Sequence, residues 1–141
     1  MTTPDDRRKG SISELPEEEC LALLETTTVG RIAFVDAQGQ QLVPVNFAVI
    51  DGEIYFRTVH DGFLSSLAHG HDDVAFGVDY QNEFRVGWNV TVRGSAREVD
   101  DRATINTVLA HPRVKPWAGG VRPLVIKVTP VSIAGRRVTG G

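Results

Sequence analysis

The sequence predicts a mainly β domain of the α+β class, in which six strands form a small antiparallel barrel and three short helices pack outside it. Two observations predict this fold. Short segments that alternate apolar and polar residues recur along the chain, and Gly, Asp and Pro turn residues separate them. The chain has 141 residues, of which 41% are hydrophobic. That is enough for one domain whose core needs no disulfide or structural metal.

The first helix is expected from about Pro16 to Thr26. A proline suits the first position of a helix, and the three glutamates that follow it favour the positive end of the helix dipole. Apolar residues at helical spacing, with Cys20 among them, give the helix a side that faces the core. Because no histidine is close to it in sequence, Cys20 is interpreted as a small core residue rather than a reactive thiol.

The six strands are separated by recognisable turn signals. Asp51-Gly52 is a strong signal for a two-residue hairpin between the second and third strands. Pro44 removes one backbone donor within the second strand, so an edge or a bulge is expected there. Gly87 and Gly94 indicate bends or close backbone approach in the fifth strand. The predicted strands cover residues 29–35, 42–50, 53–58, 74–80, 86–99 and 124–133.

Two further helices are expected, over residues 62–69 and 101–110. Gly70 is interpreted as the C-terminal stop of the first of them, and Asp100 as the N-cap of the second. The charged, Pro- and Gly-containing start of the chain is expected to be a flexible tail. The expected boundaries are an N-terminal tail over residues 1–10, one domain over residues 11–137 and a C-terminal tail over residues 138–141.

Composition argues against several classes of protein. The formal net charge is -3, whereas a nucleic-acid-binding domain more often has a basic surface. Cys20 is the single cysteine, so no intrachain disulfide is possible, which is typical of a reducing compartment. The N-terminus has no apolar core of a signal peptide, and no apolar run approaches the roughly 20 residues of a membrane span. We therefore expect a cytoplasmic protein without nucleic-acid or membrane partners.

An ordered set of short motifs carries a resemblance to a known family. The chain resembles the pyridoxamine 5'-phosphate oxidase-like superfamily of flavin-binding split barrels, and most of all its branch of small nitroimidazole-resistance-type reductases. The resemblance covers about Glu14 to Ile133, and it implies a six-stranded antiparallel split β-barrel. It also implies a homodimer that binds FMN, or in some members the deazaflavin F420, at the subunit interface. The motifs are GRIAFVD, PVNFAV, DGEIYFRT, GFLSSL, VAFGVD and GWNVTVRGSAREV.

The resemblance implies residues that lie along the flavin ring. Val45 and Asn46, on the second strand, would present backbone groups to the polar edge of the ring. Trp88 and Asn89, which open the fifth strand, would lie near the ring and reach it across the dimer interface.

The resemblance also implies a phosphate site at the end of the third strand. Arg57 and Thr58 would face the phosphate, because a guanidinium offers two donors to that anion and a hydroxyl adds another. The start of the following helix, with Gly62, Phe63 and Leu64, would direct its amides at the same anion.

Phe63 departs from the family pattern. The two positions matching Gly62 and Phe63 usually hold Ser or Thr and then Lys or Arg, and the basic residue binds the phosphate. Phenylalanine cannot donate a hydrogen bond. A hydrogen bond to a charged group is worth about 1.5–3 kcal/mol, so its loss would weaken FMN binding by roughly 10- to 100-fold.

No catalytic or metal-binding residue is assigned from the sequence. No Ser-His-Asp or Cys-His arrangement is present at a family-specific spacing, and a flavin enzyme needs neither. His69, His71, Asp72 and Asp73 form a local cluster, but Gly70 and the expected helix end favour solvated capping over a metal site.

Three hypotheses for function follow. The first is a dimeric flavin-binding oxidoreductase, with FMN or alternatively F420, that transfers hydride between the flavin ring and an unknown small substrate. The second is a protein on the same barrel that binds haem or an apolar small molecule, which Phe63 motivates. The third is an interaction-bearing dimer without a small ligand.

Overall fold

The computed structural model describes residues 10–60, 62–114 and 123–140. Within these ranges the chain forms seven β-strands, two α-helices and two short 3-10 helices. The helices are α2 (Glu17–Leu24), η1 (Ser65–His69), α3 (Arg102–Ala110) and η2 (Pro112–Val114). The strands are β1 (Ser11–Leu15), β2 (Val29–Asp36), β3 (Gly39–Ile50), β4 (Glu53–Thr58), β5 (His71–Gln81), β6 (Val86–Glu98) and β7 (Leu124–Thr139).

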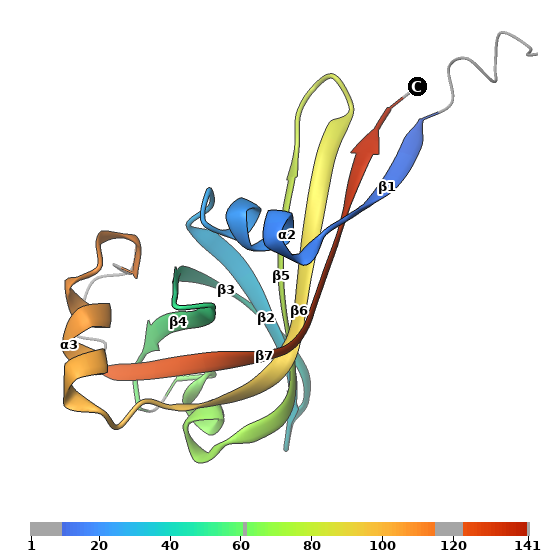
Figure 1. Cartoon of the computed structure of the whole chain (residues 1–141). Coiled ribbons are helices and arrows are strands. Elements are labelled where there is room, and N and C mark those ends of the chain that lie inside the picture. The colour runs from blue at the N-terminus through green and yellow to red at the C-terminus, as the bar shows by residue number, and fades with distance from the viewer. Residues whose placement is uncertain (1–9, 61, 115–122, 141) are drawn as a thin grey trace, which may run out of the picture.

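All strand pairs are antiparallel, and their order is β1-β7-β4-β3-β2-β5-β6. An additional pairing of β6 with β7 closes a ring of six strands, from β7 through β4, β3, β2, β5 and β6 back to β7. Strand β1 pairs with β7 outside this ring. Strands β6 and β7 lie side by side along most of their length and extend above the body of the molecule (Figure 1).

The core fills the ring. Alternate residues of all six ring strands form one buried cluster, which Cys20 and Leu24 of α2 also join. Phe47 and Phe76 meet edge to face at its centre, with 4.8 Å between ring centroids. Gly30 permits this packing, because a Cβ added there would overlap the ring of Phe76. A smaller cluster lies on the outer face of β3, β4 and β7 and includes Val108 of α3 and Val114 of η2.

The hairpin prediction is confirmed. Asp51 and Gly52 form the two-residue turn between β3 and β4, with φ angles of 52° and 77°. Both angles are positive, as a type I′ hairpin turn requires. The buried side of α2 is Cys20 and Leu24, so the expected core role of Cys20 is also observed.

The counts of strands and helices differ from the prediction of six strands and three helices. Strand β1 was missed, because Ser11–Leu15 lies at the edge of the sheet and is almost wholly exposed, so it lacks the alternation of a half-buried strand. The helix expected over residues 62–69 is the 3-10 helix η1, held by bonds such as Leu67 N–H to Leu64 O at 3.1 Å. Strand β7 continues past the predicted end at Ile133 to Thr139.

The predicted cap at Asp100 is wrong by one residue. Asp101 caps α3, and its carboxylate accepts bonds from the Thr104 backbone N–H at 2.9 Å and the Thr104 hydroxyl at 2.6 Å. These hydrogen bonds hold the pKa of Asp101 below its usual value, since they favour the charged form. Among the described helices, none is long and apolar enough to cross a membrane.

Candidate functional site

The end of β4 and the segment that follows it form a close backbone junction. Thr58, the last residue of β4, is 4% exposed. A Cβ added at Gly62 would lie 2.9 Å from Val59 Cγ2 and 3.5 Å from Thr58 Oγ1. A side chain at position 62 would therefore crowd Val59 and contact the threonine hydroxyl, so glycine suits this position.

Arg57 and Thr58 point to opposite faces of β4. Neighbouring residues of a strand alternate in direction, and their register partners identify the two faces. Arg57 is opposite Val125, which belongs to the outer cluster near α3, and Thr58 is opposite Leu124, which belongs to the core of the ring. A phosphate that uses both side chains must therefore sit over the strand end, where β4 stops.

Asn46 of β3 lies next to Arg57 of β4 where the pairing of these two strands ends. The β3–β4 ladder has Phe47 opposite Phe56, and Asn46 and Arg57 are the next positions on the two strands. Both are half-buried. Val45 lies on the other face of β3, is 8% exposed and packs in the core. The structure thus places the Asn46 side chain on the same face as Arg57 and the Val45 side chain in the core, and the expected backbone contacts of both residues with the ring stay a prediction.

Phe63 and Leu64 have different surroundings. Leu64 is 6% exposed and belongs to the core, whereas Phe63 is 72% exposed. Phe63 borders an open hollow of about 430 Å³, together with Gly62, the β2–β3 turn at residues 36–38 and the serines of η1. Leu64 therefore anchors this segment and Phe63 faces the surface.

Sequence reasoning missed Ser66, which also borders the hollow. Its Oγ is buried and has no hydrogen-bond partner among the residues that the structure describes. The neighbouring Ser65 hydroxyl, by contrast, donates to Gly62 O at 2.7 Å. The two adjacent serines in GFLSSL were the available signal.

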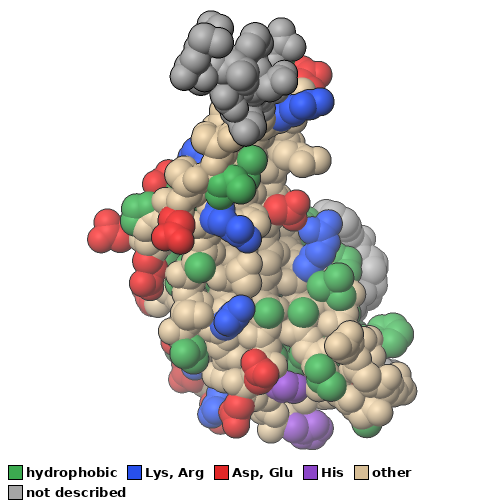
Figure 2. All heavy atoms as spheres, turned by 90° about the vertical axis from the view of Figure 1, so that its right-hand side faces the viewer, with side chains coloured by type: hydrophobic (Ala, Val, Ile, Leu, Met, Phe, Trp, Pro, Cys, Tyr) green, Lys and Arg blue, Asp and Glu red, His purple; other side chains and the backbone are tan. Residues whose placement is uncertain are grey.

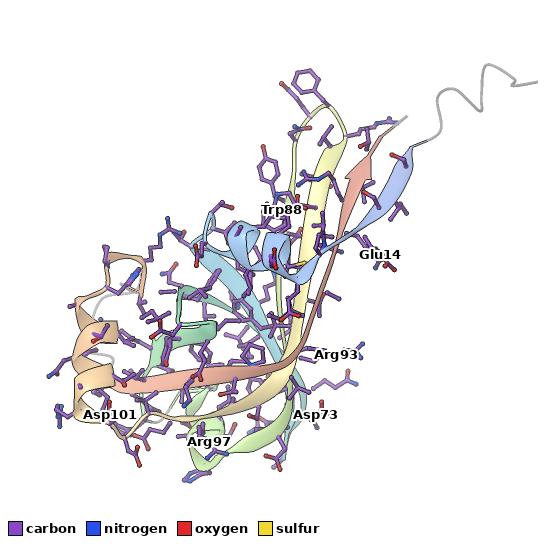
Figure 3. All side chains as sticks on the ribbon, viewed as in Figure 1. Glu14, Asp73, Trp88, Arg93, Arg97 and Asp101 are labelled. Atoms are coloured by element: carbon purple, nitrogen blue, oxygen red, sulfur yellow. The ribbon has the colours of Figure 1, made fainter. Side chains whose placement is uncertain are left out.

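Trp88 and Asn89 lie in another part of the chain. Trp88 is 9% exposed and stacks on Tyr80, with 6.4 Å between ring centroids. It lies above α2 on the projecting part of β6, well away from β4 (Figures 1 and 3). Asn89 is exposed on the opposite face of β6. One copy of the chain therefore does not bring these two residues to the predicted phosphate site.

Comparison with known proteins identifies the family. A family model described as pyridoxamine 5'-phosphate oxidase matches residues 16–137. The chain belongs to the pyridoxamine 5'-phosphate oxidase family. The resemblance to the split-barrel superfamily is thereby confirmed.

Three relatives show how much of the family's length the chain spans. A candidate pyridoxamine 5'-phosphate oxidase from Corynebacterium glutamicum is 30% identical, with a TM-score of 0.80, over 92% of this chain and 95% of that one. An FAD-binding protein from Mycobacterium smegmatis is 31% identical, with a TM-score of 0.74, over 90% of this chain and 98% of that one. An uncharacterized protein from Mycobacterium tuberculosis is 29% identical over 133 residues, 90% of this chain and 86% of that one.

The groups at the end of β4 are chemically suited to the phosphate of a flavin cofactor. This junction combines the cation of Arg57, the hydroxyl of Thr58 and, at Gly62, a position where an added Cβ would lie 2.9 Å from Val59 Cγ2. The unpartnered hydroxyl of Ser66 lies farther along the same segment. These features suit an anionic ligand that lies close to the backbone.

Nearby residues engage the polar atoms of two ionisable side chains, Tyr55 and His71. Burial raises the pKa of Tyr55, and Glu53, whose carboxylate accepts from the Tyr55 hydroxyl at 3.3 Å, raises that pKa further. Tyr55 is therefore protonated at neutral pH. Both ring nitrogens of His71 have backbone partners, Val35 O at 2.9 Å and Asp73 N at 3.2 Å, so this ring is committed to local structure.

Proposed function

We propose that the chain is a flavin-binding split-barrel oxidoreductase that transfers hydride between the flavin ring and a small substrate. The observation that carries the proposal is the junction of Thr58 and Gly62 at the end of β4, beside Arg57. The 31% identical FAD-binding protein from Mycobacterium smegmatis supports a flavin as the ligand. FMN and FAD share the same ring and the same first phosphate, so this junction suits either.

Each residue at the junction has a separate task. Arg57 neutralises the phosphate charge and offers it two donors, and Thr58 adds a hydroxyl donor at the strand end. Gly62 lets the backbone approach the phosphate closely. Asn46 presents an amide to the polar edge of the ring. When bound, the flavin supplies the hydride chemistry, and the protein supplies orientation and a site shielded from water.

We also propose that the protein is a homodimer, whose second copy supplies Trp88 and Asn89 to the ring. An open hollow of about 310 Å³ crosses the outer face of β3, β2, β5 and β6. It is lined by the small residues Ala33, Ala75 and Gly77 and by Leu42, which is 67% exposed. In Figure 1, α2 and α3 lie to the left of the upright parts of β6 and β7, and the face seen in Figure 2 carries hydrophobic side chains among charged ones. Such a face suits a second copy.

A second candidate keeps the fold and changes the ligand. Phe63 replaces the basic residue that binds the phosphate in the family pattern, and it is 72% exposed. This observation favours haem or an apolar small molecule. F420 is a further alternative to FMN, since it also carries a phosphate and a tricyclic ring.

A ligand screen tests the proposal. The purified chain is titrated with FMN, FAD, F420 and haem, and binding is followed by absorbance and by quenching of flavin fluorescence. We expect uptake of a flavin at micromolar concentration, and light scattering should give the mass of a dimer. Uptake of haem alone would favour the second candidate. If the chain binds none of the four ligands, the remaining hypothesis is the interaction-bearing dimer without a small ligand.

A further inference from the structure

Phe63 has a position that the stability of the fold does not explain. Its side chain is 72% exposed, whereas its neighbour Leu64 is 6% exposed and holds the segment in the core. An exposed aromatic face beside a ligand site is available to stack against a planar group. Phe63 directly follows Gly62, which lies against the Thr58 hydroxyl.

The space beside Phe63 is a built hollow rather than flat surface. It measures about 430 Å³ and is bordered on one side by η1 and on the other by the β2–β3 turn. The turn is held in shape by Asp36, whose carboxylate accepts from the Gln38 backbone N–H at 2.9 Å and from the Gln41 side chain at 3.3 Å. The hydrogen-bonded turn and Phe63 thus border the same hollow.

Two polar residues also border the hollow. Ser66 borders the hollow with a buried hydroxyl that has no partner in the described part of the chain. Gln38, whose side chain is exposed, supplies an amide at the opposite rim. One aromatic face, one amide and one hydroxyl are the groups with which proteins bind a nucleobase, by stacking on its face and hydrogen bonding at its edge.

We propose that this hollow binds the adenine of FAD, with the base stacked on Phe63, and that the protein therefore selects FAD over FMN. The inference rests on the proposed flavin function. FMN ends at the phosphate that the junction of Thr58 and Gly62 would hold, and so leaves the adjoining hollow empty. FAD continues from that phosphate through a second phosphate and a ribose to adenine.

The substitution of the family's basic residue has a physical reason in this arrangement. A Lys or Arg at position 63 would supply one more donor to the single phosphate of FMN. A phenylalanine gives up that donor and gains a stacking surface for the base that only the dinucleotide carries. Stacking of a base on an aromatic side chain is typically worth about 5- to 150-fold in affinity.

The test is a titration of the full chain with FAD and with FMN, followed by flavin fluorescence, for the wild type and three variants. Phe63→Leu keeps an apolar side chain but removes the aromatic face, and Phe63→Tyr keeps the face. Phe84→Leu is the matched control, because Phe84 is 75% exposed but lies in the turn between β5 and β6.

We expect the wild type to bind FAD more tightly than FMN. Phe63→Leu should weaken FAD binding by roughly 5- to 150-fold and leave FMN binding unchanged within about twofold. Phe63→Tyr and Phe84→Leu should bind both flavins as the wild type does. Because Phe63 is exposed, the unfolding midpoint of Phe63→Leu should match that of the wild type.

Two outcomes would overturn the inference while the proposed function stands. In one, Phe63→Leu binds FAD as tightly as the wild type does. In the other, it weakens FAD and FMN equally, which would place Phe63 against a part that the two flavins share. If the wild-type chain binds neither flavin, the proposed function and this inference fail together.

Discussion

Replacing Thr58 with valine removes the one hydroxyl at the strand end while it preserves the shape of the side chain. Thr58 is 4% exposed, and its Oγ1 lies 3.5 Å from where a Cβ on Gly62 would be. If that hydroxyl donates to the flavin phosphate, its loss removes a hydrogen bond to a charged group. Such a bond is worth about 1.5–3 kcal/mol, so the affinity for FMN and FAD should fall by roughly 10- to 150-fold.

The assay is a fluorescence titration of Thr58→Val with each flavin, with Thr58→Ser as the matched control. Serine keeps the hydroxyl and loses one buried methyl group, which costs about 0.8 kcal/mol of folding stability. We therefore expect Thr58→Ser to bind flavin nearly as the wild type does and to unfold at a slightly lower temperature. Wild-type flavin affinity in Thr58→Val would refute the assignment of Thr58 to the phosphate.

Three further predictions concern single side chains. Arg57→Gln should weaken FMN and FAD by roughly 10- to 150-fold in the same titration but leave riboflavin, which has no phosphate, unchanged; equal loss for all three would point to a disturbed fold. Phe63→Lys should tighten FMN by roughly 10- to 100-fold, and no change would mean that the phosphate is held elsewhere. Asp101 has a folded pKa below its unfolded value, so its stabilising effect is present above about pH 3.9 and is lost as the pH falls through the folded pKa. If the wild type unfolds at a higher temperature than Asp101→Asn at pH 7, this difference in unfolding temperature should therefore vanish in acid. A difference that persists in acid would contradict the cap assignment.

Local patterns predicted the strands and turns of the fold well. The Asp51-Gly52 hairpin and the third predicted strand agree with the structure residue for residue, because the two-residue turn fixes where β3 ends and β4 begins. Strand β1 escaped detection because it is an almost wholly exposed edge strand and so shows no alternation of apolar and polar residues.

The candidate site was only partly visible in the sequence. The family resemblance assigned Arg57 and Thr58 to one phosphate site, yet strand alternation turns their side chains to opposite faces. The hollow beside Phe63 joins the β2–β3 turn to η1. That contact depends on how the ring of strands closes, so no motif could have predicted it. The orphaned hydroxyl of Ser66 likewise becomes visible only when its neighbours in space are known.

The affinity of the wild-type chain for FMN relative to riboflavin tests most directly whether the end of β4 is a phosphate site. The two ligands share the ring and differ by the phosphate that Arg57, Thr58 and Gly62 would hold. We expect riboflavin to bind at least about 10-fold more weakly than FMN, which is the loss of one or more charged hydrogen bonds. Equal affinity for the two ligands would show that the phosphate contributes nothing and would contradict the site.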